Sequence, residues 1–447
     1  METATDKNAH AESVFIFNSC EHSLKNKGDM AMLIGIIDWL HSHYANAKLI
    51  VFSSNIAEFS ALTSIRPVEI RESPEAYFSP LCKDRRISRL VSLFPGRLRA
   101  IAKGAWFTAC FLLFRISGHA VIRDSRCRQF FSDMITARAL VFSGGGYLNS
   151  LWWLHGLYGK AFAALVARLA RVPVLLSSQG IGPIDHWMDR LVLRLLLNCA
   201  TRIGVRESNT SALIAAIAPE ASHKIVHTWD DALLLQADKS QISNLPVDGA
   251  PGKVLIGVNL RDSSGYSAIP HRRGMSEIAV LLDRIVERGE RHLVFIPISY
   301  NPGDDDRHSA EQIVSLMRHP GRTTLLSEEL PPAAIKAIIA RMDAVVGVSY
   351  HFNLFALSQN VGAIGLYETP YYQHKLSGLF SIYGMEKWCV PCSGEHYGTI
   401  LNKTEEMLLS ASTLRSHLQA VNSTLQEKLD HSRNAVFGTV IDAEKRS

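Results

Sequence analysis

Short apolar runs alternate with helical patterns along most of this chain, and this alternation restricts the fold more than any other feature of the sequence. Each apolar run has the length of a β-strand, and a polar or glycine-containing turn follows it. Strands that are separated by helices pair in parallel, because the helix returns the chain to the starting end of the sheet. The sequence therefore predicts an α/β fold with mainly parallel sheets. In the first half, the expected strands are 14–17, 49–52, 139–142, 172–176, 202–205 and 225–227.

The alternation resumes after residue 252, and this indicates a second domain. Residues 240–252 are rich in Pro, Gly, Ser and Asn, which is typical of a linker. A chain of 447 residues also exceeds the usual size of one hydrophobic core. We therefore predict Rossmann-like, doubly wound domains at 12–240 and 253–395, and a helical segment with a C-terminal amphipathic helix at 401–435. The expected strands of the second domain are 254–259, 292–298, 323–326, 344–348 and 363–366.

A basic insertion is expected in the first domain at about 73–130. Eleven basic and two acidic residues lie between Lys83 and Arg128, but the formal charge of the whole chain is only +5, so we expect no nucleic-acid partner. The apolar run 105–114 is about half as long as the ~20 residues of a bilayer span. Two interpretations are open: a peripheral helix in the headgroup plane of an anionic leaflet, or a buried helix with basic residues facing water. The basic residues on either side of the run include Arg97, Arg99, Lys103, Arg115 and Arg123.

Several features bear on the cellular compartment and on metal binding. Residues 1–12 contain no apolar h-region, which predicts a cytoplasmic protein, peripheral at the inner membrane face if the headgroup interpretation holds. Cys389 and Cys392 form one CxxC pair, for which inert thiols are favoured because no second pair accompanies it. The aspartates 304–306 directly precede a predicted helix, so we expect an N-terminal cap there. We predict no metal and no cofactor.

Glycine-rich or polar segments follow the ends of several predicted strands, where doubly wound folds bind their ligands. None of these segments is a Walker loop or a dinucleotide-binding fingerprint. Each has an ordinary structural explanation when taken singly, because glycines form tight turns and an arginine after a strand often makes an ion pair. In chain order the segments are 26–29, 143–149, 178–183, 206–208 and 349–351.

The order of these segments resembles the polysaccharide pyruvyl transferase family over about 14–378, apart from the basic insertion. The resemblance implies a GT-B-like fold, in which two Rossmann-like domains face a cleft. It also implies transfer of a pyruvyl group from phosphoenolpyruvate, a donor substrate, onto sugar hydroxyls as a cyclic ketal. The acceptor is then a sugar or lipid-linked oligosaccharide for a cell-surface polysaccharide. The matching residues are Asn26, Gly28, Asp29, Gly144 to Gly146, Gln179 to Pro183, Arg206 to Ser208 and His351.

The resemblance gives the main roles in this reaction to Arg206 and His351. The planar guanidinium of Arg206 suits the carboxylate or phosphate of the donor. His351 is the expected acid for C3 of the donor, because histidine exists in both protonation states near neutral pH; phosphate binding is its alternative role. The other predicted substrate-binding residues are Asn26, Gly28, Asp29, Gly144, Gly145, Gly146, Asn149, Gln179, Gly180, Arg261, Ser349, Tyr350 and Lys375.

One position departs from the family pattern. Many members carry arginine two residues before the late histidine, where this chain has Ser349. Either another cation such as Lys375 or Arg261 supplies the charge, or the donor differs. Two other functions therefore stay open, a GT-B glycosyltransferase that uses a nucleotide sugar and a non-catalytic relative that binds anions or glycans. The acceptor sugar, its linkage and the oligomeric state do not follow from the sequence.

Overall fold

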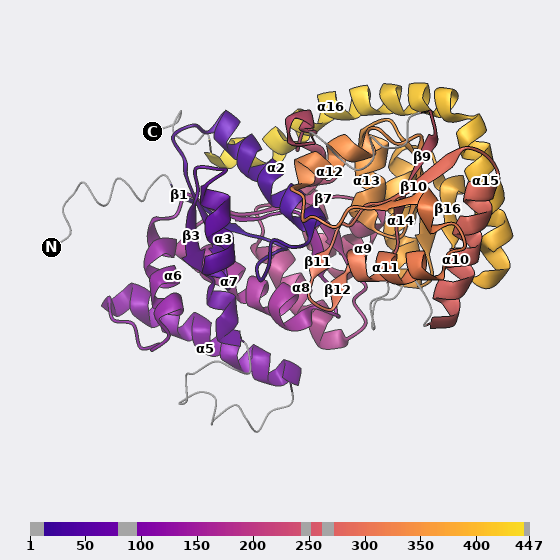
Figure 1. The fold of residues 1–447 in the computed structure, drawn as a ribbon. Helices are drawn as coiled ribbons and strands as arrows, with labels where there is room; N and C mark the ends of the chain where they lie inside the picture. The colour runs from indigo at the N-terminus through magenta and orange to yellow at the C-terminus, as the bar shows by residue number, and fades with distance from the viewer. Residues whose placement is uncertain (1–12, 79–95, 243–251, 262–271, 442–447) are drawn as a thin grey trace. The chain divides into compact units, whose positions relative to one another are not determined.

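The computed structural model describes residues 13–78, 96–242, 252–261 and 272–441. Contacts within the chain divide it into two compact units. Unit 1 consists of Met1–Leu24, Met32–Leu234 and Leu429–Ser447, and unit 2 consists of Lys25–Ala31 and Leu235–Lys428. Figure 1 shows helices arranged around a parallel sheet in each unit. Most of the predicted linker, and the basic residues between 83 and 89, lie outside the described residues.

The sheet of unit 1 has the order β3-β2-β1-β4-β6-β7-β8, with β5 paired to β6. Every pair is parallel, so the fold-class prediction is confirmed. Two strands, β3 and β5, were not predicted; Gly145 and Gly146, expected in a turn, belong to β5. The strands are β1 (Ser13–Phe17), β2 (Lys48–Ser53), β3 (Glu69–Glu72), β4 (Ala139–Phe142), β5 (Gly145–Leu148), β6 (Val174–Ile181), β7 (Arg202–Val205) and β8 (Ile225–His227).

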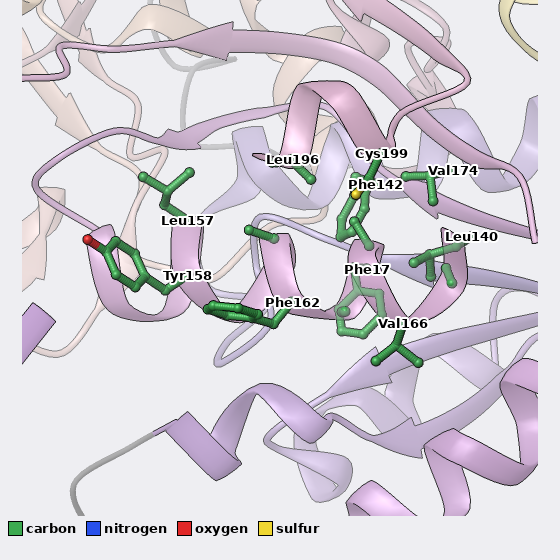
Figure 2. Packing of buried hydrophobic residues seen from close by; sticks show 14 of the residues in the cluster. Phe17, Leu140, Phe142, Leu157, Tyr158, Phe162, Val166, Val174, Leu196 and Cys199 are labelled. Carbon is green, nitrogen blue, oxygen red and sulfur yellow. The ribbon is translucent and has the colours of Figure 1, made fainter. Parts of the chain in front are cut away.

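Helices pack their apolar sides on this sheet and form one hydrophobic core. Figure 2 shows side chains of β1, β4 and the helix α7 meeting there, among them Phe17, Phe142 and Phe162. The order of strands reverses between β1 and β4, so the loops after these two strands flank the switch point of the sheet. The helices are α2 (Lys27–His43), α3 (Ile56–Thr63), α5 (Gly96–Ser117), α6 (Ser125–Thr136), α7 (Lys160–Ala170), α8 (Trp187–Cys199) and α9 (Ser208–Ile217), with a π-helix at Trp153–Gly159.

The sheet of unit 2 has the order β13-β10-β9-β14-β15-β16, and all its pairs are parallel. Its switch point lies between β9 and β14. The short β16, which was not predicted, contains Cys389. The strands are β9 (Val254–Asn259), β10 (Arg291–Phe295), β13 (Thr323–Leu325), β14 (Ala344–Gly347), β15 (Gly362–Tyr367) and β16 (Cys389–Pro391); the helices are α10 (Arg272–Glu287), α11 (Asp306–Leu316), α12 (Pro332–Ile339), α13 (Tyr350–Ser358) and α14 (Pro370–Ile382).

Two helices, α15 (Tyr397–Leu409) and α16 (Ala411–Ile441), close the chain. The predicted apolar stripe of α16 is confirmed, because Leu418, Leu425 and Leu429 are buried. The end of α16 belongs to unit 1, and there Arg433 is completely buried. Its guanidinium donates to the carboxylate of Asp231 at 2.8 Å.

The apolar helix of the basic insertion is longer than the sequence run predicted. α5 contains 22 residues, and within the described part of the chain it is the one helix long and apolar enough to cross a bilayer. One third of the most apolar 18-residue stretch of α5 is buried in the fold. Phe107 and Phe111 lie in the core of unit 1, whereas Trp106, Leu112 and Leu113 are exposed, so neither sequence interpretation describes the helix completely.

The Arg433 and Asp231 pair gives a first test of the fold. Arg433→Met is expected to lower the free energy of unfolding by about 3–5 kcal/mol, because it leaves a carboxylate buried without its cation. Urea unfolding followed by fluorescence measures this loss. Arg415→Met, on the exposed side of the same helix, is the matched control and should change stability by less than about 0.5 kcal/mol. Equal stability of the two variants would show that burial of the Asp231 carboxylate does not require its ion pair with Arg433.

Candidate functional site

His351 lies at the carboxyl edge of the second sheet, next to the switch point. It stands in the first turn of α13, which follows the central strand β14, and it is only 8% exposed. The hydroxyl oxygen of Ser349 caps this helix by accepting a hydrogen bond from the amide of Phe352. The ring of Tyr350 packs edge-on against the imidazole at 5.2 Å between centroids. Ser349 is thus a capping residue, and it orients the helix that carries His351.

The predicted Asn-x-Gly-Asp motif also belongs to unit 2, although it comes near the start of the chain. Asn26 caps α2, because its side-chain oxygen accepts hydrogen bonds from the amides of Gly28 at 3.1 Å and Asp29 at 3.3 Å. The amide of Lys27 donates to the carbonyl of Ile298 at 2.8 Å, and this bond attaches the segment to the loop after β10.

Gly28 is in direct contact with His351. A Cβ atom at position 28 would lie 2.0 Å from Nδ1 of His351, so no larger residue fits without moving the imidazole. The structure therefore brings together two predicted motifs that are far apart in the sequence. It also places the positive end of α2, where backbone N–H groups favour anions, beside the histidine.

Arg261 lies on the other side of the switch point, directly after β9. Its guanidinium makes a bidentate pair with Asp306, with N–O distances of 2.7 and 3.2 Å. Burial alone would lower the pKa of Arg261, but the carboxylates of Asp306 and Asp304 raise it above its ordinary value. Arg261 is thus a permanently charged group with partners of its own.

Two of the three consecutive aspartates, Asp305 and Asp306, have separate roles, and the predicted cap is confirmed. Asp305 caps α11 by accepting from the amide of Arg307. Asp306 is 2% exposed and accepts hydrogen bonds from the amides of Ile298 and Ser299 at 2.8 and 2.9 Å. Asp306 therefore fixes the same loop that binds the first turn of α2.

Lys375 lies near the residues that precede His351. Its ammonium group is 5.7 Å from the centroid of the Tyr350 ring and 3.3 Å from the hydroxyl of Tyr371. Burial raises the pKa of Tyr372, although the nearby positive charges of Arg261 and Lys375 oppose this shift. Both cations therefore act on one phenol at this edge of the sheet.

The glycine-rich segment of unit 1 follows β4 and is held by Asp231. The amide of Gly144 donates to this carboxylate at 3.0 Å, and the hydroxyl of Ser178 donates to it at 2.7 Å. The side-chain amides of Asn149 and Gln179 are fully buried and donate to backbone carbonyls, including those of Gly146 and Ser143. These contacts stabilise the loop, and substrate binding by the two amides stays a prediction.

Arg206 follows β7 and is 3% exposed. It makes ion pairs with Glu207 and with Asp230, the latter at 3.0 Å. A Cβ atom at Gly180 would lie 2.6 Å from Nη2 of Arg206, so the glycine admits the guanidinium. These ion pairs agree with the structural alternative for Arg206, and its contact with a donor stays a prediction.

A cluster of ionisable residues at the edge of the first sheet was missed by the sequence reasoning. Glu21 follows β1 at the switch point, and Glu75 lies in the short helix Pro74–Phe78. Lys160, which begins α7, has its ammonium group 3.0 Å from Glu75 and 3.6 Å from Glu21. All three side chains are at most 4% exposed. A glutamate four residues after the end of the first strand was the one available signal, because Glu75 and Lys160 lie in no recognisable motif.

In this cluster, Glu21 with Glu75 and Lys160, a hydrogen bond couples the two carboxyl groups, and their pKa values shift in opposite directions. Burial and the negative charge of Glu21 raise the pKa of Glu75 well above its ordinary value. Burial would also raise the pKa of Glu21, but a hydrogen bond with Glu75 and the charges of Lys160 and His22 lower it instead. Glu75 is therefore the member of the pair that takes up a proton more readily, and Glu21 is the member that stays ionised to lower pH. The rings of His22, which is exposed, and His155 lie 5.5 Å apart beside them.

The CxxC pair has the character of inert thiols. Burial raises the pKa of both Cys389 and Cys392 to about 12, so the two thiols stay protonated at neutral pH and are poor metal ligands. In the part of the chain that the structure describes, no three His, Cys, Asp or Glu side chains are grouped as metal ligands.

The two parallel sheets place this protein in the GT-B class of folds. The UDP-GlcNAc 2-epimerase from Neisseria meningitidis is similar at 12% identity and a TM-score of 0.55, covering 97% of this chain and 100% of that chain. Alr3699/HepE from Anabaena is similar at 13% identity and a TM-score of 0.52, covering 94% and 99%. At these identities the likeness shows the fold alone, and it is the predicted one.

The sequence then identifies the family within this class. The model of the polysaccharide pyruvyl transferase family matches residues 26–370, which include every predicted site residue except Lys375. The chain belongs to this family of transferases, so the resemblance is confirmed. The amylovoran biosynthesis protein AmsJ of Erwinia amylovora is 20% identical over 404 residues, which cover 87% of this chain and 90% of AmsJ.

The position of Lys160 between two buried glutamates predicts different effects for two substitutions. Lys160→Met is expected to destabilise the protein by about 3–5 kcal/mol at neutral pH, because it removes the cation that lies beside both buried carboxyl groups. Glu75→Gln should cost clearly less, because an uncharged amide replaces the carboxyl group whose ionisation burial disfavours. Urea unfolding at neutral pH measures both, and equal losses would contradict this difference between the two positions.

The same cluster predicts a pH dependence of stability. A raised pKa in the folded state means that Glu75 holds its proton more tightly there than in the unfolded chain. The contribution of Glu75 to the free energy of unfolding is therefore complete at low pH, and it is lost as the pH rises from the ordinary glutamate range through the raised pKa. The pKa of Glu21 is lowered in the folded state, so its contribution to stability is present above the ordinary glutamate pKa and is lost as the pH falls through the lowered pKa. As the pH rises above the ordinary glutamate range, the free energy of unfolding of Glu75→Gln should therefore decline less steeply than that of the wild-type protein.

Proposed function

We propose that this protein transfers a pyruvyl group from phosphoenolpyruvate to two hydroxyls of a sugar, as a cyclic ketal, during assembly of a cell-surface polysaccharide in the cytoplasm. Membership of the family supports a transferase, and the similarity to AmsJ supports a role in exopolysaccharide synthesis. The donor and the ketal product are the part of the proposal that experiment must establish.

The observation that carries the proposal is the contact between Gly28 and His351. A histidine that lies beside a helix N-terminus meets the two needs of phosphoenolpyruvate at one place. The N-terminus favours the negative groups of the donor, and the imidazolium provides a proton close to them. The capping of α2 by Asn26 and of α13 by Ser349 fixes both partners.

The reaction balances with the groups in this unit. His351 gives a proton to C3 of the donor, which makes C2 electrophilic, and one sugar hydroxyl forms a bond to C2. The bond between C2 and the phosphate oxygen breaks with its electron pair, and the second hydroxyl closes the ketal. Of the two protons that the hydroxyls release, one restores His351 and the other leaves on inorganic phosphate.

Lys375 is the proposed substitute for the arginine that many family members carry at position 349. Its charge lies beside Tyr350, next to His351, whereas Arg261 is already bound to Asp306. An ammonium group acts as a point charge toward phosphate and needs no planar partner.

A GT-B glycosyltransferase is the second candidate. The two solved structures named above were determined with nucleotide sugars, UDP-GlcNAc in the epimerase and UDP-glucose in Alr3699/HepE. A calorimetric comparison of phosphoenolpyruvate with UDP-sugars separates the candidates, since each predicts binding of a different donor. Release of phosphate together with a pyruvyl ketal on a sugar acceptor, detected by NMR, would establish the first.

Gly28 gives the sharpest test of the donor site. Gly28→Ala is expected to weaken phosphoenolpyruvate binding at least about tenfold, because the new Cβ displaces the imidazole of His351. Gly398→Ala is the matched control, since a Cβ there meets nothing within 4 Å. Titration calorimetry measures both. Wild-type affinity in Gly28→Ala would move the donor site away from His351.

Compensation by Lys375 is tested by loss and rescue. Lys375→Met should weaken binding of the same donor about tenfold, whereas Lys428→Met, an exposed change of equal charge, should not. Ser349→Arg alone removes the cap of α13 and is expected to be neutral or harmful. Partial recovery in the double variant Ser349→Arg with Lys375→Met would support the substitution. Unchanged binding in Lys375→Met would refute it.

A further inference from the structure

The helix α5 has two apolar faces. One face packs into the core of unit 1, and its buried residues include Phe107, Cys110 and Phe111. A helix at the surface of a water-soluble domain normally turns polar residues outward. On α5 the outward face is apolar instead.

The outward residues lie seven, four, three and four positions apart at 98, 105, 109, 112 and 116, with 106 and 113 beside them, so they form one stripe along the helix. Their exposed fractions rise along α5 from 38% at Leu98 and 39% at Trp106 to 48% at Leu113 and 84% at Ile116. Ala105 and Ala109 are exposed between them. We call Leu98, Ala105, Trp106, Ala109, Leu112, Leu113 and Ile116 the α5 stripe.

Cations lie along both margins of the α5 stripe. Helical spacing places Arg99 on one side of it and Arg115 on the other. Arg115 is exposed, as are Arg123 and Arg128 in the segment that follows α5. Such a surface suits the interface of a bilayer with anionic lipids, because the apolar residues and the tryptophan can reach the acyl chains while the cations lie beside the headgroups.

Two basic residues that the sequence suggested for this contact serve the fold. Arg97 makes a bidentate ion pair with Asp189 at 2.8 and 3.0 Å. Lys103 is 5% exposed, with its ammonium group 3.5 Å from the carbonyl of Phe78. Changing either residue would disturb unit 1 itself, so a test of surface binding has to use the stripe.

We propose that the α5 stripe docks this protein on the surface of a bilayer that contains anionic phospholipid, with the helix lying in the plane of the headgroups. The buried face of α5 is part of a packed core, so the helix lies on the membrane rather than across it. The positive margins of the α5 stripe also disfavour contact with a second copy of the same surface, because like charges would face one another.

Vesicle co-sedimentation tests the proposal without donor or acceptor. The protein should bind vesicles of phosphatidylcholine with phosphatidylglycerol, bind phosphatidylcholine alone weakly, and lose binding as salt rises. The variant Leu112→Ser, Leu113→Ser and Ile116→Ser should bind about tenfold more weakly. Leu316→Ser with Leu409→Ser, which changes residues 49% and 87% exposed in unit 2, is the matched control and should bind normally.

Three results would overturn the proposal. They are failure of the wild-type protein to bind anionic vesicles, equal binding by the stripe variant, and a stripe variant that changes only self-association in sedimentation velocity. The last result would make the stripe an interface between copies. Thermal unfolding controls for the fold, and Ile116→Ser alone, at the most exposed position, replaces the triple variant if that does not fold. None of these residues belongs to the donor site, so failure here leaves the proposed reaction untouched.

Discussion

Two buried aspartates hold the strand-end loops of this protein, because a carboxylate out of contact with water must collect a cation and several hydrogen bonds. In unit 1, Asp231 accepts from the amide of Gly144, from the hydroxyls of Ser177 and Ser178, and from Arg433. In unit 2, Asp306 accepts from Asn259, Arg261 and the amides of two loop residues. Each carboxylate joins loops from different strands, so these loops cannot move independently.

The position of His351 follows from this arrangement in unit 2. Asp306 binds the amides of Ile298 and Ser299, and the carbonyl of Ile298 binds the amide of Lys27. The first turn of α2 is thereby held so that Gly28 touches the imidazole. Asp306 thus acts on the approach of α2 to His351 through the loop at Ile298 and Ser299, which makes it a positioning residue for this candidate site.

The sequence was informative wherever the signal was local. Apolar runs such as 139–142 and 254–259 predicted their strands to the residue, and the aspartates before α11 predicted its cap. Contacts between distant segments were not predictable in this way. Arg433 and Asp231 are 202 residues apart in the sequence. An arginine in a C-terminal helix gives no sign, in the sequence alone, that it forms a buried ion pair. The cluster of Glu21, Glu75 and Lys160 was missed for the same reason, since its members come from three separate elements.

The distribution of unit 1 over three stretches of chain affects how it forms during translation. Its whole sheet has been synthesised by His227, but the arginine that neutralises Asp231 is made 202 residues after that aspartate. At roughly 5–20 residues per second this interval lasts on the order of 10–40 s. During it the growing chain carries a carboxylate that favours an open, hydrated edge of the sheet. The ion pair of Asp231 with Arg433 can therefore form only after the second unit has been synthesised, although most of the first unit is made earlier.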